Sequence, residues 1–496
     1  MTVPRDVLAE VDALFAARVA DRVAPSSVWG VFDREGLVAS GGHGDRGDGS
    51  APDADTVYRI ASCTKSVTAA TLLTLVAEGS VALDDPITTA VPAFAEVALP
   101  SPDAPVPTLR MLLTMSGGLP TDDPWADRQE SIDDDALDAV LRAGLLFDSV
   151  PGTRFAYSNT GYALLGRAIA RAAGTPYVRA VTDRVLRPLG LTDTVFSAPE
   201  ARGFVVVGQR DDDGSWTPQP MTGPGAFSPI GGLFSTVRDL ARWARYLASA
   251  STAAPEDGPV SPADRRAMQQ AMRIVPSSVV PAAKRPTAYG FGLFVEQDDR
   301  AGEIVSHSGG YPGFSAHVRW SVEHGLGVVA FENATQAKVS APAERALDLL
   351  LAETLDARAA AAAASTTTSG SADAPGVRQT TEATHTARRA VTTLLQAWAD
   401  PAVDDDSAAD LGAAVCTPNV PLDRPWTARR RALLESAHAV GADLAAAPVD
   451  EQSSVPSHLR WWLPGNAGRL RIEIRLAPLA AGRVQSLTVT PERAEH

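Results

Sequence analysis

The sequence contains very little lysine, since only three of its 44 basic residues are lysine and the rest are arginine. An arginine guanidinium keeps its proton in proteins, whereas a desolvated lysine amine can lose it. Lys65 stands at the start of an apolar run that predicts a helix, three positions after Ser62. A lysine at this place, in a chain that otherwise uses arginine, indicates a group that transfers a proton.

Cysteine and long apolar segments are also scarce. The two cysteines, Cys63 and Cys416, fall in different predicted domains, so we expect no disulfide between them. No run of about 18 uninterrupted apolar residues suggests a membrane span. The N-terminus runs into an acidic amphipathic helix and lacks the basic and apolar regions of a signal peptide. We therefore expect a cytoplasmic protein with no membrane partner.

Several functional motifs are missing from the chain. It has no His-Glu-x-x-His, paired Cys-x-x-Cys or calcium-loop pattern, so we expect neither a metal nor another cofactor. It has no Gly-x-Ser-x-Gly, which argues against an α/β-hydrolase. The net charge of −15 and the pI near 5.0 argue against nucleic acid as a partner.

The length of 496 residues predicts two or three domains. Strand patterns occur at both ends of the first 356 residues, and residues from about 80 to 225 are mainly helical. This order predicts an α/β unit with an inserted all-helical lobe and a ligand cleft between the two. The expected strands are at 27–32, 37–40, 289–297, 303–307, 314–321 and 326–332.

The composition changes after residue 356. Residues 357–384 are rich in Ala, Ser and Thr and predict a flexible linker. Residues 385–496 then predict a small accessory domain, in which 470–476 alternates apolar and charged side chains as a half-buried strand does. Helices followed by such strands favour an α+β fold, with a short barrel-like unit as the alternative.

Ser62 and Lys65 lie one helical turn apart, on one face of the predicted helix. Such a pair suits a serine nucleophile with a lysine base. A free lysine has a pKa of about 10.4, so action as a base near neutral pH requires a depression of roughly 3 units, or about 4 kcal/mol. Burial would lower the pKa, and the helix N-terminus would favour an anionic oxygen on Ser62.

Two further segments carry polar groups that suit such a site. Tyr157 can offer a phenol to the Ser62 oxygen, and Asn159 can offer an amide to an acyl carbonyl. His307 would place a switchable positive charge beside the nucleophile, and Gly309 and Gly310 would let a substrate lie against the strand edge. Alone, the Tyr157 segment is a weak signal that a core tyrosine would also explain, and a lone histidine such as His307 is more often structural than catalytic.

Together these segments resemble the serine β-lactamase and penicillin-binding-protein-like superfamily, closest to its class C β-lactamase, D-Ala-D-Ala carboxypeptidase and family VIII esterase branch. The resemblance covers roughly residues 10–355 and implies an antiparallel sheet flanked by helices. The motifs that carry it are Tyr58–Lys65, Leu109–Leu119, Tyr157–Asn159, Gly231–Leu240 and His307–Gly310.

The resemblance implies a role for each candidate residue. Ser62 is the acylated nucleophile, Lys65 its base or proton relay, and Tyr157 the group that activates the acyl acceptor. Asn159 orients the substrate carbonyl side. The backbone N–H groups of Ser62 and Gly310 form the oxyanion hole.

One position departs from the family pattern. His307 takes the place of the lysine in the Lys-Thr-Gly motif, which makes β-lactamase activity less expected. Trp125 is expected near the cleft rim as a substrate contact. Cys63 is expected to pack behind the helix and not to react.

We therefore predict a cytosolic serine acyl hydrolase or acyltransferase that acts through acyl-Ser62 on an ester, thioester or amide. The chain most resembles the stand-alone penicillin-binding-protein-type thioesterases, which release and cyclise nonribosomal peptides and carry a small lipocalin-like C-terminal domain. That resemblance implies a peptidyl substrate presented by a carrier protein and a D-residue at its acylating end.

The alternatives are a β-lactamase, D,D-peptidase or family VIII-type esterase acting on small molecules, and a catalytically silent binding protein that only uses the fold. An intact set of Ser62, Lys65 and Tyr157 argues against the silent protein. Water, an alcohol and an amine all stay open as the acyl acceptor.

Overall fold

The structure is a computed structural model that describes residues 3–277, 285–299, 301–352, 381–453, 455–479 and 481–493. Most of the predicted linker at 357–384 lies outside the described residues. Two hydrophobic cores, one on each side of this gap, define two units. The first, residues 3–352, holds every candidate catalytic residue of the sequence and is called the catalytic unit; the second, residues 381–493, is called the C-terminal unit. No helix within the described part is long and apolar enough to cross a membrane.

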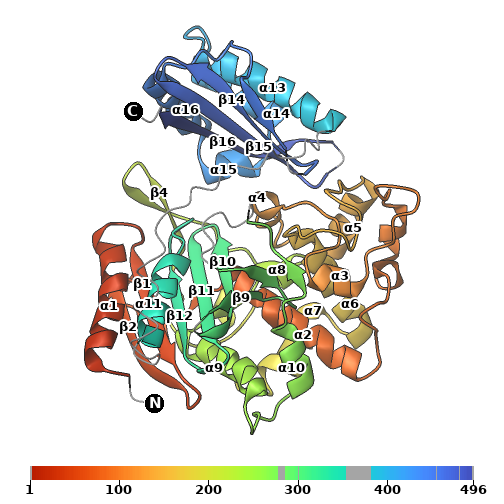
Figure 1. The fold of residues 1–496 in the computed structure, drawn as a ribbon, viewed down its shortest axis with the longest axis vertical. Coiled ribbons are helices and arrows are strands. Elements are labelled where there is room, and N and C mark those ends of the chain that lie inside the picture. Colours follow the sequence, from red (N-terminus) through yellow and green to blue (C-terminus); the bar gives the residue numbers. More distant parts are fainter. Residues whose placement is uncertain are drawn as a thin grey trace.

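The catalytic unit is built on one eight-stranded antiparallel sheet, in the order β2-β1-β12-β11-β10-β9-β8-β7. Its central strands are buried over their whole length because helices cover both faces. Figure 1 shows this sheet with α1 on one side and the helical lobe on the other. The strands are β1 (Ser26–Phe32), β2 (Leu37–Gly44), β7 (Arg273–Ile274), β8 (Thr287–Tyr289), β9 (Phe294–Asp298), β10 (Gly302–Tyr311), β11 (Phe314–Ser321) and β12 (Gly327–Glu332).

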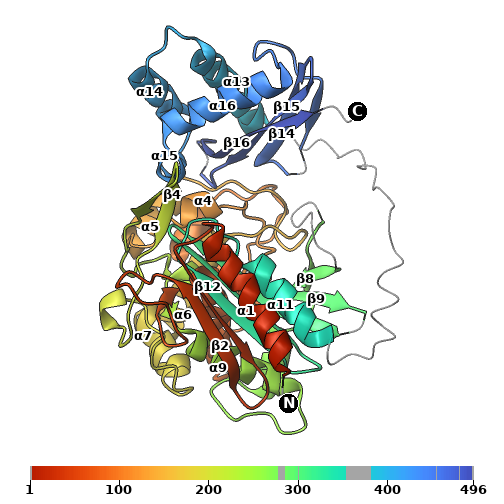
Figure 2. The same cartoon turned by 90° about the vertical axis from the view of Figure 1, so that its left-hand side faces the viewer.

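Two terminal helices, α1 (Arg5–Ala20) and α11 (Ser340–Ala352), pack together on one face of this sheet. They meet it through a separate apolar cluster that includes Phe15, Trp29 and Leu347. Figure 2 shows both helices side by side over the strands. The two ends of the catalytic unit therefore close one layer, as the strand patterns at both ends of this region predict.

The other face of the sheet carries the helical lobe, as expected. Helix α2 is buried on all sides from Thr64 to Leu75, which explains why its sequence is not amphipathic. The buried Thr68, Thr71 and Thr74 donate to backbone carbonyls of the same helix. The lobe consists of α2 (Thr64–Ala77), α3 (Leu109–Leu113), α4 (Asp123–Ala126), α5 (Asp134–Arg142), α6 (Asn159–Ala173), α7 (Tyr177–Val181), α8 (Ser228–Gly231), α9 (Val237–Ala248) and α10 (Pro262–Met268). The short strand pairs β3 (Tyr58–Arg59) with β6 (Phe234–Ser235), and β4 (Gln209–Asp212) with β5 (Ser215–Pro218), complete it.

The C-terminal unit has an α+β fold. Four helices precede an antiparallel sheet in the order β13-β14-β15-β16, which its described residues leave open and do not close into a barrel. The unit sits above the catalytic unit at α4 (Figure 1). Its elements are α13 (Glu382–Ala399), α14 (Asp405–Val415), α15 (Asn419–Asp423), α16 (Trp426–Val440), β13 (Asp450–Gln452), β14 (His458–Gly465), β15 (Gly468–Leu476) and β16 (Val484–Arg493).

Candidate active site

Ser62 lies in a short 3₁₀ turn, Ala61–Cys63, between strand β3 and helix α2. Ala61 holds a positive φ of 48°, a conformation that non-glycine residues rarely adopt. Strand β10 packs directly against this turn, since a Cβ on Gly309 would lie 2.2 Å from the Ile60 carbonyl oxygen. The turn places Ser62 at the wall of a large cavity, with 7% of the residue exposed.

Lys65 is fully buried and bonded to the nucleophile. Its Nζ donates to Ser62 Oγ at 2.9 Å and to the Ile230 carbonyl at 2.8 Å. Burial lowers the pKa of Lys65 to about 8, although nearby aspartates, Asp123 foremost, pull it upward. The amine also lies 4.9 Å from the centre of the Tyr157 ring. A substantial neutral fraction near physiological pH suits a general base.

An acidic segment, formed by Asp122, Asp123 and Asp127, faces this lysine and was not among the candidate residues of the sequence. Asp122 accepts from the Asn159 and Thr160 backbone N–H groups (2.7 and 2.9 Å) at the start of α6, and burial raises its pKa to about 6. Asp123 and Asp127 line the cavity, and burial raises the pKa of both carboxyls. The signal was present as two adjacent aspartates before Pro124, but only the fold brings them to Lys65.

Tyr157 completes the group around the nucleophile. Its hydroxyl lies near the Ser62 side chain, and its ring stacks on Phe294 with 6.3 Å between centroids. Burial raises the pKa of Tyr157 well above 10, with a further contribution from the negative charge of Asp123, although the nearby Ser62 side chain pulls this pKa down. The phenol therefore stays protonated at neutral pH. A neutral phenol can relay a proton between an incoming acceptor and the lysine.

His307 is neutral, and the expectation of a switchable positive charge at this position is wrong. The residue is 1% exposed, and burial, followed by repulsion from Lys65, lowers its pKa to about 3. Its Nδ1 bonds to the Ser308 carbonyl at 2.6 Å, and Tyr289 lies 3.1 Å from its Nε2. These partners fit an imidazole that donates from Nδ1 and accepts at Nε2, so it contributes shape and hydrogen bonding but no charge.

The predicted substrate-binding residues separate into two groups. The ladder between β10 and β9 ends at Ser306, so the β10 edge at 307–311 faces the Ser62 turn, and Gly310 lines the cavity there. Gly309 instead permits the close approach of β10 to this turn. Asn159 is buried and donates from Nδ2 to Asp123 Oδ1 at 2.6 Å, so it orients Asp123.

Trp125 does not line the cavity. It is buried edge-on against Phe227, with 5.6 Å between ring centroids. The short helix α4 turns Asp123 and Asp127 toward the cavity and Trp125 into the core. Cys63 is also buried behind the site, where its thiol donates to the His307 carbonyl at 3.3 Å and burial raises its pKa to about 12.

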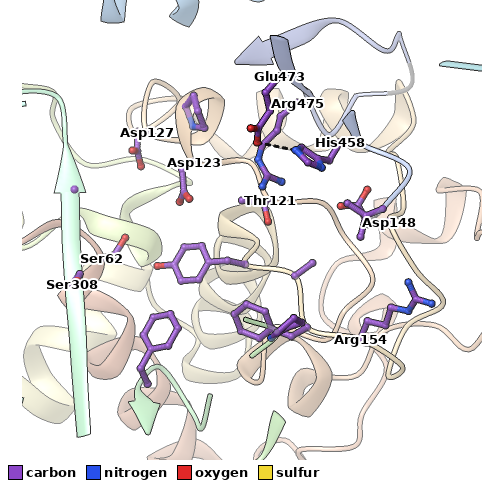
Figure 3. Close-up of a pocket in the computed structure, with 18 of the residues that line it drawn as sticks. Ser62, Thr121, Asp123, Asp127, Asp148, Arg154, Ser308, His458, Glu473 and Arg475 are labelled. Atoms are coloured by element: carbon purple, nitrogen blue, oxygen red, sulfur yellow. Dashed lines mark hydrogen bonds and ion pairs between the residues drawn. The ribbon is translucent and has the colours of Figure 1, made fainter. Parts of the chain in front are cut away.

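The cavity has a volume of about 1610 Å³ and is walled by both units. The catalytic unit supplies Ser62, Tyr157, His307 and Gly310, together with the acidic segment. Figure 3 shows His458, Glu473 and Arg475 reaching toward this cavity from the C-terminal sheet. None of these three was a candidate from the sequence alone, because nothing local in β14 or β15 distinguishes them from ordinary surface residues.

The catalytic unit has an antiparallel sheet with an inserted helical lobe, and a serine hydrogen-bonded to a lysine lies between them. This combination defines a protein of the β-lactamase/transpeptidase-like class. A profile of the family described as Beta-lactamase matches residues 11–353. The chain belongs to this family of serine hydrolases.

Two relatives illustrate the range of the family. The chain is 30% identical over 257 residues to the D-alanyl-D-alanine-carboxypeptidase/endopeptidase AmpH of Escherichia coli K12, across 47% of this chain and 63% of AmpH. It is 30% identical over 384 residues to esterase EstB of Burkholderia gladioli, across 68% of this chain and 93% of EstB. The match to AmpH therefore spans less than two thirds of that relative.

Two solved structures share the fold. A D-stereospecific amidohydrolase from Streptomyces sp. superposes with a TM-score of 0.55 at 26% identity, over 68% of this chain and 97% of its own. The octameric penicillin-binding protein homologue from Pyrococcus abyssi superposes with a TM-score of 0.60 at 20% identity. That likeness covers 98% of both chains, so it extends to the C-terminal unit.

Proposed function

We propose that this protein is a serine acyl hydrolase or acyltransferase that forms an acyl-Ser62 intermediate, and that its specific substrate is a peptidyl thioester which it releases and cyclises. The observation that carries the acyl-transfer step is the 2.9 Å hydrogen bond between the Lys65 amine and Ser62 Oγ. This lysine is buried and has a pKa of about 8. In a fraction of the enzyme molecules at neutral pH, Lys65 is therefore a neutral amine that can accept the Ser62 proton.

The proposed reaction has two halves. In the first, Lys65 takes the Ser62 proton as Oγ attacks the acyl carbonyl, and the backbone N–H groups of Ser62 and Gly310 stabilise the developing oxyanion. The leaving thiolate then takes this proton from Lys65. In the second, an amine or water attacks the acyl-enzyme. Tyr157 relays the acceptor's proton to Lys65, which passes a proton to Ser62 Oγ as the bond between Oγ and the acyl group breaks.

Three features support a peptidyl thioester in particular. The cavity of about 1610 Å³ exceeds the roughly 300–1,000 Å³ usual for small-molecule sites. The C-terminal unit forms one wall of this cavity and restricts the access of bulk water. This favours an amine of the substrate itself, over water, as the acyl acceptor. The D-stereospecific amidohydrolase among the structural neighbours supports a D-residue at the acylating end. A carrier protein that presents the thioester, and a cytoplasmic location, belong to the same proposal.

The test is to incubate the protein with a linear peptidyl thioester ending in a D-residue and to identify the products by mass spectrometry. Ser62→Ala serves as the inactive control, and the same thioester ending in the L-residue tests stereochemistry. A macrocycle formed only with Ser62 and only from the D-substrate supports the cyclase. A linear acid alone contradicts cyclisation and leaves an acyl hydrolase.

Hydrolysis of a small ester is the second candidate, because the similarity to esterase EstB extends over 93% of that enzyme. Turnover of short p-nitrophenyl esters with a kcat/KM above that for the peptidyl thioester would favour it. We expect slow turnover of nitrocefin, because a neutral His307 supplies no charge for the β-lactam carboxylate.

A further inference from the structure

The C-terminal unit forms a wall of the active-site cavity and is fixed there by buried polar contacts. Gln485 donates from Nε2 to the Thr121 carbonyl at 2.8 Å, immediately before the acidic segment of the site. Asp148 of the catalytic unit accepts from the Ser457 N–H at 2.9 Å and from its hydroxyl at 2.6 Å. These contacts hold the sheet of the C-terminal unit in a defined position relative to Ser62.

Arg475 projects from this wall toward the reacting centre. It lies on β15, and the register with β16 shifts between Arg475 and Leu476. The extra residue at this bulge is Gln485 of β16, which bonds to Thr121, and bulges are frequent beside active sites. The side chain lines the same cavity as Ser62, and its guanidinium points into the cavity beside Thr121 (Figure 3).

The guanidinium of Arg475 has no hydrogen bond or ion pair to any side chain among the described residues. Its neighbours on the same wall are paired with one another. Glu473 bonds to His458 at 2.8 Å, and Arg460 donates to Gln452 at 3.0 Å from Nε. The structure therefore leaves Arg475 as an unpaired cation on this wall, partly shielded from solvent and facing the cavity.

We propose that Arg475 binds an anionic oxygen group of the substrate, either a carboxylate of the peptide or the phosphate of a phosphopantetheine thioester. This inference rests on the proposed function and names a class of substrate for it. A planar guanidinium matches both groups with two parallel N–H donors. The C-terminal unit thereby serves as a specificity element, and the catalytic unit carries out the acyl transfer.

The acidic neighbours do not replace such a ligand. Asp123, Asp148 and Glu473 feel the charge of Arg475, which pulls the pKa of each carboxyl down. None is within ion-pair distance of it, and each has a closer partner, Asn159, Ser457 and His458 respectively. Arg154 also lines the cavity, but it is exposed and well solvated there, and Arg273 lines it from β7 of the catalytic unit. Among the described residues of the C-terminal unit, Arg475 is the arginine whose side chain lines the cavity without a hydrogen bond or ion pair.

The test compares Arg475→Gln with Arg471→Gln in the full chain. Arg471 lies on the same strand and is already paired with Glu492 at 3.3 Å, outside the cavity, so it is a matched loss of charge. Three series of thioesters share one peptide sequence. In the first, the peptide is neutral, with Gln at the varied position, and its thiol is pantetheine. In the second, Glu replaces Gln at successive positions on the same pantetheine thioester, and in the third, the neutral peptide is carried by phosphopantetheine. The measurement is kcat/KM from thiol release, with thermal unfolding as a check on folding.

We expect Arg475→Gln to lower kcat/KM at least about 10-fold for one anionic series and to change the neutral series less than about 2-fold, as for loss of a charge-assisted hydrogen bond. A loss confined to the Glu series identifies a peptide carboxylate, and one confined to the phosphopantetheine series identifies the phosphate. Arg471→Gln should change none of them. An equal loss for neutral and anionic substrates would overturn the proposal and leave Arg475 a structural role.

A second readout separates this inference from the proposed function. The competitors are unreactive amide analogues of the same three substrates: the Gln peptide, the Glu peptides and the neutral phosphopantetheine conjugate. Each one competes with a neutral fluorophosphonate that labels Ser62. In the wild type, one anionic competitor should protect at a concentration at least about 10-fold below that of the neutral peptide, and this difference should vanish in Arg475→Gln. Protection without thioester turnover would refute the thioesterase and keep the anion site. Equal protection by all competitors would refute the anion site.

Discussion

The proton affinity of Lys65 makes the sharpest prediction, because the structure gives both its value and its causes. Burial lowers the pKa to about 8 from an ordinary 10.5. The neutral amine is the active base, so acylation of Ser62 must rise with pH. About one tenth of the lysine is neutral at pH 7 and about half at pH 8, which predicts a roughly 5-fold rise over that unit.

The assay is the second-order rate of Ser62 labelling by a fluorophosphonate from pH 6 to 9.5, since this measures acylation without deacylation. Between pH 8 and 9.5 the rate should rise about 2-fold at most. A lysine with its ordinary pKa would give a rise of about 30-fold over the same interval. A rise of that size would refute the depressed pKa. Lys65→Arg should abolish labelling, because arginine stays protonated.

Substitution of a neighbour tests the electrostatic cause. Asp123 is the strongest of the charges that pull the Lys65 pKa upward, so Asp123→Asn should shift the rate profile to lower pH. The asparagine can still accept from Asn159, so the change removes mainly charge. Asp103→Asn, on an exposed loop outside the cavity, is the control and should leave the profile unchanged. The same pH profile of the labelling rate also tests His307. A second inflection of the rate near pH 6.5 would show that His307 titrates there, which would contradict the effect of its burial.

Three other substitutions or treatments probe the packing around the site and the interface. Gly309→Ala places a Cβ 2.2 Å from the Ile60 carbonyl oxygen and should lower the free energy of unfolding by about 1–3 kcal/mol, whereas Gly310→Ala meets nothing within 4 Å and should unfold like the wild type; equal thermal midpoints would contradict this packing. Burial raises the pKa of Asp148 to about 6, above its ordinary 3.8, so its contribution to stability is present below about pH 4 and is lost as the pH rises through 6. In denaturant unfolding at pH 8, Asp148→Asn should therefore be more stable than the wild type by up to about 3 kcal/mol. This difference in the free energy of unfolding should disappear toward pH 4. Burial raises the pKa of Cys63 to about 12, so iodoacetamide at pH 8 should label it only after unfolding, and rapid labelling of the native protein would contradict its burial.

The elements of the site that the sequence predicted are those set by local spacing. Ser62 and Lys65 are three residues apart at the start of a helix, so any helix there brings their side chains together. The apolar strand pattern at 303–307 similarly places His307 in the sheet, although it gives neither the neighbours of β10 nor its continuation through Gly310 to Tyr311. These predictions depended on periodicity, which one sequence displays directly.

The properties that the sequence could not predict arise from residues distant in the chain. His307 is neutral because Lys65 and aromatic side chains of neighbouring strands enclose it, among them Tyr289 and Phe294. Trp125 faces the core because the four-residue helix α4 is too short for a periodic pattern to reveal its orientation. In both cases the identity of the side chain was known, and its surroundings decided the outcome.

The distribution of charge between the two units explains why one sequence motif is insufficient to name the substrate. In the β-lactamase/transpeptidase-like pattern, the 307 position carries the cation that a substrate anion requires, but here burial keeps His307 neutral. On the other unit, Arg475 supplies an unpaired cation that faces the cavity. If bond formation depends on one unit and anion recognition on the other, changes at Ser62 or Lys65 must affect every substrate equally. Changes at Arg475 must separate charged substrates from neutral ones, a division that no catalytic motif in the first 356 residues encodes.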